Sequence, residues 1–429
     1  MNKAIAAFLG RHNFSVHQNI NPVVDALLHD MREGLSGRPA SQDMIRTYCT
    51  PPSETATGKS VIVIDAGGTN FRSCLVTFDS IGKPSIDFME KTNMPGVERE
   101  LSRAEFFEHL AKNLEHVKDK ADRIGFCFSY PMTITEDGDG ILLGFSKEVK
   151  APEVVGCHIG AELAKALSAH GWKNKMRISL LNDTLAALLA GAAGTNSGKR
   201  YSSYIGFILG TGMNGAYIQS ATPEYKIAKE QVIVCESGKF DKIGRSDFDD
   251  AFDAHSISPG TSRIEKMCSG AYLGPVGLYV IRAAAKEGLL SAPFAASLLQ
   301  IEQLSLVELD TFLHSPYGTS SVLGKKAAET ATGQDYDMLF QLLDAVVDRS
   351  ARYAAAILSA CVIQSGKGGT ASRPVCILCN GTTFHKTYKL QVRVEGYLEQ
   401  LLTRERNLHY EIIRCENDIT LGTAIAGLL

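Results

Sequence analysis

Residues 61–72, which read VIVIDAGGTNFR, restrict the fold of this chain more than any other stretch. Four consecutive β-branched apolar residues predict a strand buried on both faces. The strand runs into Asp65 and a glycine pair, and residues 73–78 then predict a second strand. Glycines in such a tight turn let the backbone approach a ligand and expose N–H groups to an anion, while Asp65 and Thr69 add oxygens suited to a Mg²⁺-associated water. On these residues alone, a β-hairpin whose glycines only turn the chain is the favoured interpretation.

A second stretch repeats this design. Residues 204–218 read YIGFILGTGMNGAYI, an apolar strand, a Gly-Thr turn with an Asn just beyond it, and another strand. Residues 374–383 are a weaker third echo, which predicts a further hairpin. Two hairpins of this kind about 140 residues apart suggest an internal duplication with a phosphate cradle at the centre of each half.

Size and charge narrow the class of protein. A chain of 429 residues exceeds what one core usually supports, so two domains are expected. The net charge of −3 provides no broad basic field, which argues against nucleic acid as the main partner. Ten cysteines without a framework spacing predict reduced thiols and a cytoplasmic protein. No apolar stretch approaches the ~20 residues that span a bilayer, so no transmembrane segment is expected. The oligomeric state stays open.

Three acidic positions each carry two interpretations. Asp183 follows the strand predicted at 177–181 and precedes an apolar helix, so it is either a helix N-cap or a ligand-facing group at a strand end, and the two roles are compatible. Glu236 lies beside a glycine turn, where a solvated loop acid is the commoner outcome. Ser262 and Glu265 have capping-box spacing, and spacing alone favours that role.

The rest of the chain is mostly helical. Residues 1–36 are expected to form an amphipathic helix, and packing on the core or exposure to solvent is favoured over docking on a membrane or partner. Residues 37–60 are a connection. The histidines form no H-x-x-x-H or comparable set, so no protein-borne metal cluster is expected. Further helices are predicted at 160–170, 272–287, 293–302, 304–313, 321–332, 335–359, 388–403 and 421–429.

The order of these motifs resembles the hexokinase family, within the actin-like sugar-kinase superfamily, from about residue 61 to the C-terminus. Residues 65–72 look like the family's first phosphate loop, and residues 210–214 like its second. The other matching motifs are Phe128-Ser129-Tyr130-Pro131, Ser146-Lys147, Asn182-Asp183-Thr184, Glu236 with Gly238-Lys-Phe240, and the segment 263–274 around Glu265.

The resemblance implies a set of roles. Asp183 would be the general base that accepts the proton of a hexose 6-hydroxyl as it attacks the γ-phosphorus of ATP, with Lys147 as a second catalytic residue. Asp65 would hold Mg²⁺ through water. The implied sugar-binding residues are Ser129, Ser146, Lys147, Asn182, Asp183, Asn214, Glu236 and Glu265. The implied nucleotide-binding residues are Asp65, Gly67, Gly68, Thr69, Asn70, Arg72, Gly210, Thr211, Gly212, Gly381 and Thr382.

The family fold implied is α/β: a two-lobed actin-like or ribonuclease H-like ATPase fold with mixed sheets flanked by helices and a cleft between the lobes. The small lobe would contain residues 60–182 and 417–429, and the large lobe residues 1–59 and 183–416. The cleft would close on the sugar and expel water, which competes as phosphoryl acceptor.

Four motifs depart from the family pattern. Trp-Thr-Lys is Phe145-Ser146-Lys147, and Met-Glu-Trp-Gly is Cys235-Glu-Ser237-Gly238. On the nucleotide side, Asp-Gly-Thr is Asn380-Gly381-Thr382, and Asp-Gly-Ser-Gly is replaced by residues 418–422. The expected activity is therefore that of a hexokinase, and the preferred hexose and phosphoryl donor stay open.

Two alternatives to that activity remain. A sugar sensor with weak catalysis would need neither Asp183 nor two phosphate loops. A sugar kinase of the bacterial repressor-related group would carry a cysteine-rich zinc segment, which this sequence lacks.

Overall fold

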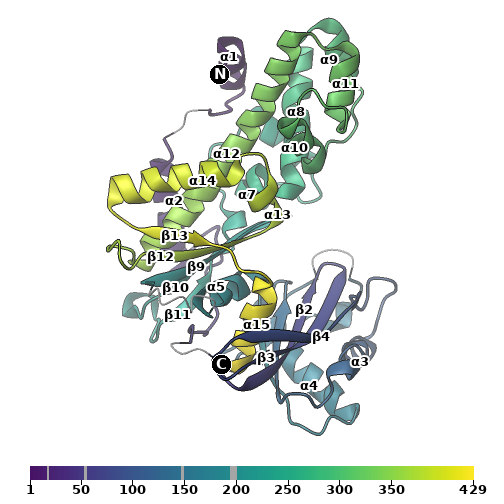
Figure 1. Ribbon diagram of the computed structural model, residues 1–429, viewed down its shortest axis with the longest axis vertical. Coiled ribbons are helices and arrows are strands. Elements are labelled where there is room, and N and C mark those ends of the chain that lie inside the picture. Colours follow the sequence, from purple (N-terminus) through teal and green to yellow (C-terminus); the bar gives the residue numbers. More distant parts are fainter. Residues whose placement is uncertain (17–18, 53–55, 146–148, 194–200) are drawn as a thin grey trace.

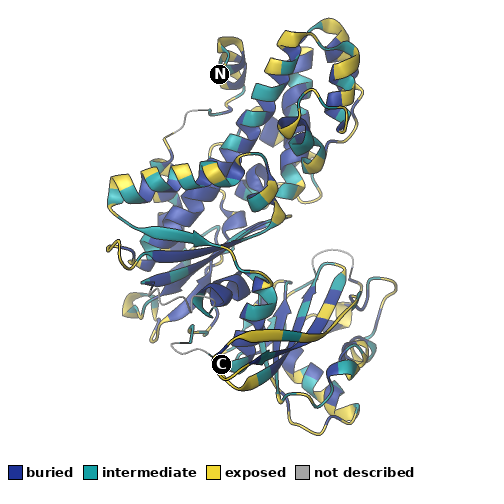
Figure 2. Ribbon diagram, viewed as in Figure 1, coloured by how far each residue is buried: buried dark blue, intermediate teal, exposed yellow. Residues whose placement is uncertain are grey.

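The computed structural model describes residues 1–16, 19–52, 56–145, 149–193 and 201–429. Two β-sheets with flanking helices make up the molecule, and one end of the larger part is a projecting group of helices (Figure 1). The predicted α/β class with mixed sheets is confirmed. Strands are buried at the centre of each sheet, whereas the edge strand β4 (Pro84–Asn93) is largely exposed (Figure 2).

The smaller sheet has five strands in the order β4-β3-β2-β5-β8. The first three strands form an antiparallel meander, and β5 and β8 add in parallel to β2. The predicted opening hairpin is present, with Gly67 paired to Asn70 across the turn. The remaining elements of this part are β2 (Lys59–Gly67), β3 (Asn70–Phe78), α3 (Arg103–Lys112), β5 (Arg123–Phe128), β6 (Met132–Ile134), β7 (Gly140–Leu142), α4 (Ile159–Ala169) and β8 (Arg177–Leu181).

The larger sheet has six strands in the order β1-β11-β10-β9-β12-β13. Without the short β1, it repeats the arrangement of the smaller sheet. Strands β9, β10 and β11 form an antiparallel meander, and β12 and β13 add in parallel on the side of β9. This shared order supports the internal duplication inferred from the two hairpins. The strands are β1 (Ile45–Arg46), β9 (Ser203–Leu209), β10 (Met213–Gln219), β11 (Gln231–Val234), β12 (Val375–Asn380) and β13 (Tyr410–Ile413).

Two helices lie between the sheets (Figure 1). The helix that follows the smaller sheet, α5 (Asp183–Ala193), packs on the larger sheet, and the last helix, α15 (Asp418–Leu428), packs on the smaller one. They also pack on each other, and their apolar side chains form one buried cluster with residues from both sheets. The two halves of the molecule are therefore joined through crossed helices.

Helices cover the rest of the larger sheet. The longest, α12 (Gly333–Ser365), packs against α2, α8 and α14. The α-helices here are α1 (Lys3–Arg11), α2 (Asn21–Leu35), α6 (Asp247–Ala254), α7 (Arg263–Cys268), α8 (Gly270–Lys286), α9 (Ala292–Leu299), α10 (Leu306–His314), α11 (Val322–Thr330), α13 (Thr382–Lys386) and α14 (Leu390–Leu398). Short 3₁₀ turns are η1 (Glu115–Val117), η2 (Pro152–Val154), η3 (Pro223–Tyr225) and η4 (Ser237–Lys239), and a π-helical turn, η5, spans Glu399–Arg404.

Two predictions about elements are wrong. Residues 1–36 form two helices, because the chain turns at Asn13, which has a φ of +56°. The third echo is a strand followed by α13, so no hairpin forms there. Of the two roles expected for the N-terminal helix, packed on the core or solvated, the structure shows packing, since Ile5, Phe8 and Leu9 are buried. Among the described residues, no helix is both long and apolar enough to cross a membrane.

Candidate active site

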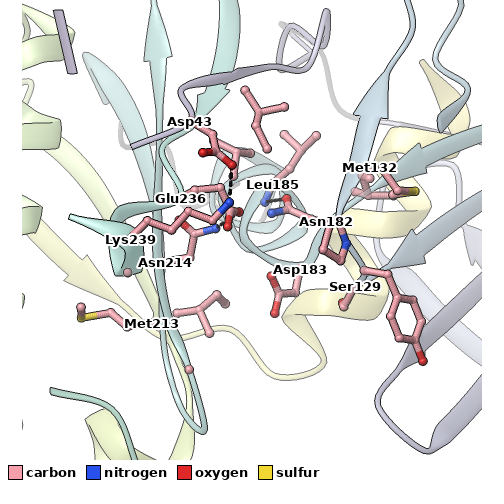
Figure 3. A pocket seen from close by; sticks show the side chains of 18 of the residues that line it. Asp43, Ser129, Met132, Asn182, Asp183, Leu185, Met213, Asn214, Glu236 and Lys239 are labelled. Atoms are coloured by element: carbon pink, nitrogen blue, oxygen red, sulfur yellow. Dashed lines mark hydrogen bonds and ion pairs between the residues drawn. The ribbon is translucent and has the colours of Figure 1, made fainter. Parts of the chain in front are cut away.

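A cavity of about 600 Å³ opens between the two sheets. Its walls come from the end of β5 and the β6 segment on one side, and from β10, η4 and α7 on the other (Figure 3). Eight residues predicted from the sequence line it: Ser129, Asn182, Asp183, Thr211, Gly212, Asn214, Glu236 and Glu265. The first and last of these eight residues, Ser129 and Glu265, are 136 positions apart in the chain, and the fold brings them to one cavity.

Asp183 enters the cavity at the junction of β8 and α5. The N-cap of α5 is the preceding residue, Asn182, whose Oδ1 accepts a hydrogen bond from the N–H of Leu185 at 2.9 Å. The interpretation of Asp183 as the N-cap is therefore wrong by one residue. The hydroxyl of Thr184 donates to Asp183 Oδ1 at 3.1 Å, and the carboxylate of Asp183 lines the cavity (Figure 3). A carboxylate at the end of a strand, facing a cavity, can accept a proton from a bound ligand.

Glu236 is held in the wall rather than in solvent. Its φ is +54°, so the backbone reverses between β11 and η4 and turns the side chain toward β10. Asn214 Nδ2 donates to Glu236 Oε1 at 2.8 Å, and Asn214 Oδ1 accepts from the N–H of Ser237 at 3.2 Å. Burial raises the pKa of Glu236, while the nearby Lys239 ammonium lowers it. The solvated-loop interpretation is therefore wrong.

Glu265 is also not a capping residue. Ser262 has a φ of +48° and makes no side-chain cap bond, so the predicted capping box does not form. Instead, the N–H of Met213 donates to Glu265 Oε2 at 2.9 Å, which fixes α7 against the 210–212 turn. A Cβ atom added to Gly212 would lie 2.8 Å from the same oxygen. A side chain at position 212 would therefore displace the Glu265 carboxylate.

The first glycine turn lies beside the cavity, without lining it. Gly68 has a φ of +61°, and its carbonyl accepts from the Tyr130 hydroxyl at 2.8 Å. Asp65 faces Arg72 across the hairpin, with 3.3 Å between Oδ2 and Nη1. Burial raises the pKa of Asp65; Arg72 lowers it, and the negative charge of Asp183 raises it further. The turn therefore presents backbone and one partly buried carboxylate near Asp183.

The second glycine turn is held by segments from elsewhere in the chain. Gly210 O accepts from the N–H of Gly270, at the start of α8, at 2.8 Å, and from the Thr383 hydroxyl at 2.9 Å. Gly381 has a φ of +120°, and a Cβ there would lie 2.1 Å from the carbonyl of Leu209. Gly381, one of the predicted nucleotide-binding residues, therefore lies next to Gly210, and neither it nor Thr382 lines the cavity.

Comparisons with known proteins identify the family. A hexokinase family model matches residues 8–193, and a second hexokinase family model matches residues 204–429. The chain belongs to the hexokinase family. Among curated hexokinases, Hexokinase-5 of Oryza sativa subsp. japonica is 27% identical over 416 residues, covering 89% of this chain and 80% of that protein. Hexokinase-1 of Schizosaccharomyces pombe is 25% identical over 440 residues, covering 96% and 87%.

Solved hexokinase structures share the fold. A Schistosoma mansoni hexokinase complexed with glucose aligns with a TM-score of 0.78 at 24% identity, covering 99% of both chains. A ROK hexokinase from Thermus thermophilus aligns with a TM-score of 0.53 at 15% identity, covering 86% of this chain and 98% of that one. The predicted two-lobed sugar-kinase fold of the hexokinase family is thereby confirmed.

Two predicted residues of the sugar site, Ser146 and Lys147, lie outside the described residues. Within the described part of the chain, no three His, Cys, Asp or Glu residues gather as a metal cluster. The expected Mg²⁺ site needs none, because Mg²⁺ keeps most of its waters and takes one or two carboxylates plus phosphate oxygens. The single, partly buried carboxylate of Asp65 fits that arrangement.

Sequence reasoning missed two charged residues of the cavity wall. Asp43, in the segment treated as a connection, and Lys239, on η4, line the cavity and form an ion pair with 2.5 Å between Oδ2 and Nζ. The pair joins positions 196 apart in the chain, and a local pattern cannot register a contact of that range. The signal that the sequence offered for Lys239 was its place in the family-like motif Gly238-Lys-Phe240, just after Glu236.

Proposed function

We propose that this hexokinase transfers the γ-phosphate of ATP to the 6-hydroxyl of glucose or a related hexose, with Asp183 as general base. Membership of the hexokinase family makes the chain an ATP-dependent phosphotransferase. The observation that carries the assignment of the base is the placement of Asp183 in the cavity while Asn182 caps the helix. The carboxylate is thereby aimed at the space that the sugar would occupy.

In the proposed step, one phosphorus–oxygen bond forms and one breaks. The hexose oxygen forms a bond to the γ-phosphorus, the bond between that phosphorus and the β–γ bridging oxygen breaks, and ADP leaves. The hydroxyl proton passes to the carboxylate of Asp183. Placing such a base contributes roughly 10²–10⁴-fold to the rate, with positioning and charge neutralisation supplying most of the rest.

The polar wall of the cavity suits a hexose. Each hydroxyl of a pyranose needs a fixed donor or acceptor, and carboxylates and amides at fixed positions provide them. We assign hydroxyl binding to Ser129, Asn182, Asn214, Glu236 and Glu265, which line the cavity. Ser146 and Lys147 are assigned the same task from their motif alone.

The two glycine turns are proposed to hold the phosphates. Exposed N–H groups of glycine turns favour anions. The residues assigned are Gly67, Gly68, Thr69, Asn70, Arg72, Gly210, Thr211 and Gly212, with Gly381 and Thr382 toward the adenosine. Asp65 would hold Mg²⁺ through water, and the ion, when bound, neutralises charge on the phosphates. Arg72, already paired to Asp65, would share its guanidinium between that carboxylate and a phosphate.

The lobes are proposed as residues 60–182 with 417–429 and residues 1–59 with 183–416. Support comes from the packing of α15 on the smaller sheet and of α5 on the larger. A cytoplasmic location is also proposed, supported by ten cysteines that are all unpaired and mostly buried, as expected of a reducing compartment.

The test of the base replaces Asp183 with alanine. We expect Asp183→Ala to bind glucose with little change by calorimetry, while the rate of hexose phosphorylation falls roughly 10²–10⁴-fold. Asp25→Ala, an exposed aspartate on α2, serves as a control and should retain full activity. Undiminished turnover by the Asp183 variant would refute the assignment.

A coupled assay for hexose-dependent ADP formation by the unmodified protein separates an enzyme from a sugar sensor. We expect turnover at the rates of an ordinary enzyme, between about 1 and 10³ s⁻¹. Glucose binding without ADP formation would support the sensor instead.

A further inference from the structure

The ion pair between Asp43 and Lys239 lies in the cavity wall beside Glu236. Figure 3 shows the Lys239 ammonium between the carboxylate of Asp43 and the side chain of Glu236. The two side chains come from different elements: Asp43 from the segment just before β1, and Lys239 from η4. Their side chains are 43% and 47% exposed, so solvent and a cavity ligand can both reach them.

Lys239 changes the hydrogen-bonding character of this wall. Among the described residues that line the cavity, it is the sole cation, and the same lining carries four carboxylates, those of Asp43, Asp183, Glu236 and Glu265. Carboxylates only accept hydrogen bonds, whereas an ammonium carries three donor hydrogens. The contact with Asp43 uses one of them, so two remain for solvent or for a ligand in the cavity.

A pyranose can use such a donor. Each hydroxyl oxygen accepts as well as donates, and the carboxylates of the wall match only the hydroxyl hydrogens. Beside Glu236, the amide of Asn214 already donates to that carboxylate, so Lys239 supplies a charged donor for an oxygen lone pair at this place. If the 6-hydroxyl faces Asp183, the hydroxyls on carbons 1, 2 and 3 lie on the side of the ring away from carbon 6. Those hydroxyls would point toward the rest of the wall, where Glu236 and Lys239 lie.

We propose that Lys239, oriented by Asp43, donates a hydrogen bond to a hexose hydroxyl on carbon 1, 2 or 3 and is a specificity-determining residue of the sugar site. The inference rests on the proposed hexose phosphorylation and goes beyond it, because it adds a substrate contact by a residue to which the family resemblance gave no role. The opposing effects on Glu236 agree with it: burial and Asp43 raise the pKa of that carboxyl, and Lys239 lowers it.

Asp43 acts as a positioning residue. A lysine side chain has a flexible four-carbon stem, so its ammonium occupies many places unless a partner holds it. A half-exposed ion pair contributes little to folding, so removing this one should leave the structure intact. The role of the pair is then to position the Lys239 ammonium, so its removal should change sugar binding without unfolding the protein.

The experiment measures kcat and KM for glucose and for its 1-deoxy, 2-deoxy and 3-deoxy analogues, with the unmodified protein and with Lys239→Met. For glucose we expect KM to rise roughly 10- to 100-fold, the effect of losing a hydrogen bond to a charged group. The kcat should change by less than about threefold, because the contact is made equally in the ground state and the transition state. Discrimination against at least one of the three analogues should fall by a similar factor.

Asp43→Asn and the double variant test the positioning role. Asp43→Asn should raise KM for glucose by less than Lys239→Met does, and the double variant should resemble Lys239→Met alone, because Asp43 acts through the lysine. The matched control is Lys112→Met, which breaks the similarly exposed pair with Glu108 on α3 and should leave all constants unchanged. Melting temperatures confirm that each variant folds.

Two failures are distinguishable. If the unmodified protein phosphorylates glucose but Lys239→Met keeps its discrimination against all three analogues, the proposed contact is wrong and the proposed function stands. If the unmodified protein neither binds nor phosphorylates any hexose, the proposed function itself is wrong, and with it the contact that rests on it.

Discussion

At the scale of single residues, neighbours in the chain take opposite tasks. Glu265 points to the cavity, while the next residue, Lys266, is only 6% exposed and turns into the protein. The Lys266 ammonium donates to Asp253 Oδ1 at 2.5 Å, to the Ser256 hydroxyl at 2.9 Å and to the Ser258 carbonyl at 2.6 Å. Since the segment from 256 to 262 leads into α7, this buried lysine anchors the element that carries Glu265.

The anchor gives a pH-dependent stability. Burial raises the pKa of Asp253, but Lys266, the N–H of Gly260 and Arg245 together lower it to about 2 from an ordinary value of 3.8. Because the folded pKa lies below the unfolded one, the contribution is complete above about pH 4 and is lost as the pH falls toward 2.

We therefore expect Asp253→Asn to lower the free energy of unfolding by about 3–5 kcal/mol at pH 6, since it leaves Lys266 buried without its counter-charge. The difference from the unmodified protein should shrink between about pH 4 and pH 2. Urea denaturation across this range measures it. A difference that stays constant down to pH 2 would contradict the assignment.

At the scale of elements, the crossing of α5 and α15 depends on one glycine. A Cβ atom added to Gly422 would lie 1.8 Å from the carbonyl oxygen of Ala186, a backbone atom that cannot move away without displacing α5. The helix backbones therefore touch at this point. The same helix approaches β5 closely, where a Cβ on Gly125 would lie 2.0 Å from the carbonyl of Thr423.

We expect Gly422→Ala to destabilise the protein by about 1–3 kcal/mol or more, because overpacking forces the two helices apart. Gly396→Ala is the matched control: it adds the same methyl group to an exposed helical glycine of α14 that has no neighbour within 4 Å, and it should stabilise by about 0.5–1 kcal/mol. Chemical denaturation of both variants checks the pair, and equal effects would exclude the packing explanation.

At the scale of the whole molecule, two sheets of the same strand order face a single cavity. Each sheet contributes a glycine turn: the turn between β2 and β3 lies near Asp183, and the turn between β9 and β10 lies beside Glu265. The sheets are joined by the crossed helices α5 and α15, so a rotation about these helices would change the width of the cavity. Such a closure would bring the two turns toward one ligand.

We expect glucose to reduce the radius of gyration in small-angle X-ray scattering, since closing the lobes on a ligand makes the molecule more compact. Asp183→Ala should show the same compaction, because the base acts on the proton and the wall holds the sugar. An unchanged scattering curve at saturating glucose would mean that the cavity binds sugar without closure.

Local patterns predicted many of the elements, because hydrophobic period and glycine punctuation act over a few residues. Both hairpins, the helical region after residue 270 and the last helix follow from such patterns. The break near Asn13 and the helix after β12 did not, because a left-handed residue and a strand-to-helix turn leave weak signals in composition.

The residues of the candidate site also divide into those that the sequence predicted and those that it did not. Eight residues that line the cavity were predicted, and the roles of Glu236 and Glu265 among them came only from the family resemblance. Their partners were not: the cap at Asn182, the bond from Asn214 to Glu236 and the pairing of Asp43 with Lys239 depend on which segments meet. Capping and solvation were reasonable local expectations for these acids, and the backbone angles at Glu236 and Ser262 overruled them.

The sequence by itself determined the two strand–glycine–strand units, their order and the identity of the acids near them, because these depend on the side chains of adjacent residues. Only the tertiary structure decided that the units face one cavity and that Lys239 is held beside Glu236. It also decided that α5 and α15 each pack on the sheet opposite to the one they follow in the chain. Those features arise from packing between residues far apart in the chain, and contacts of that range leave no mark in any short stretch of sequence.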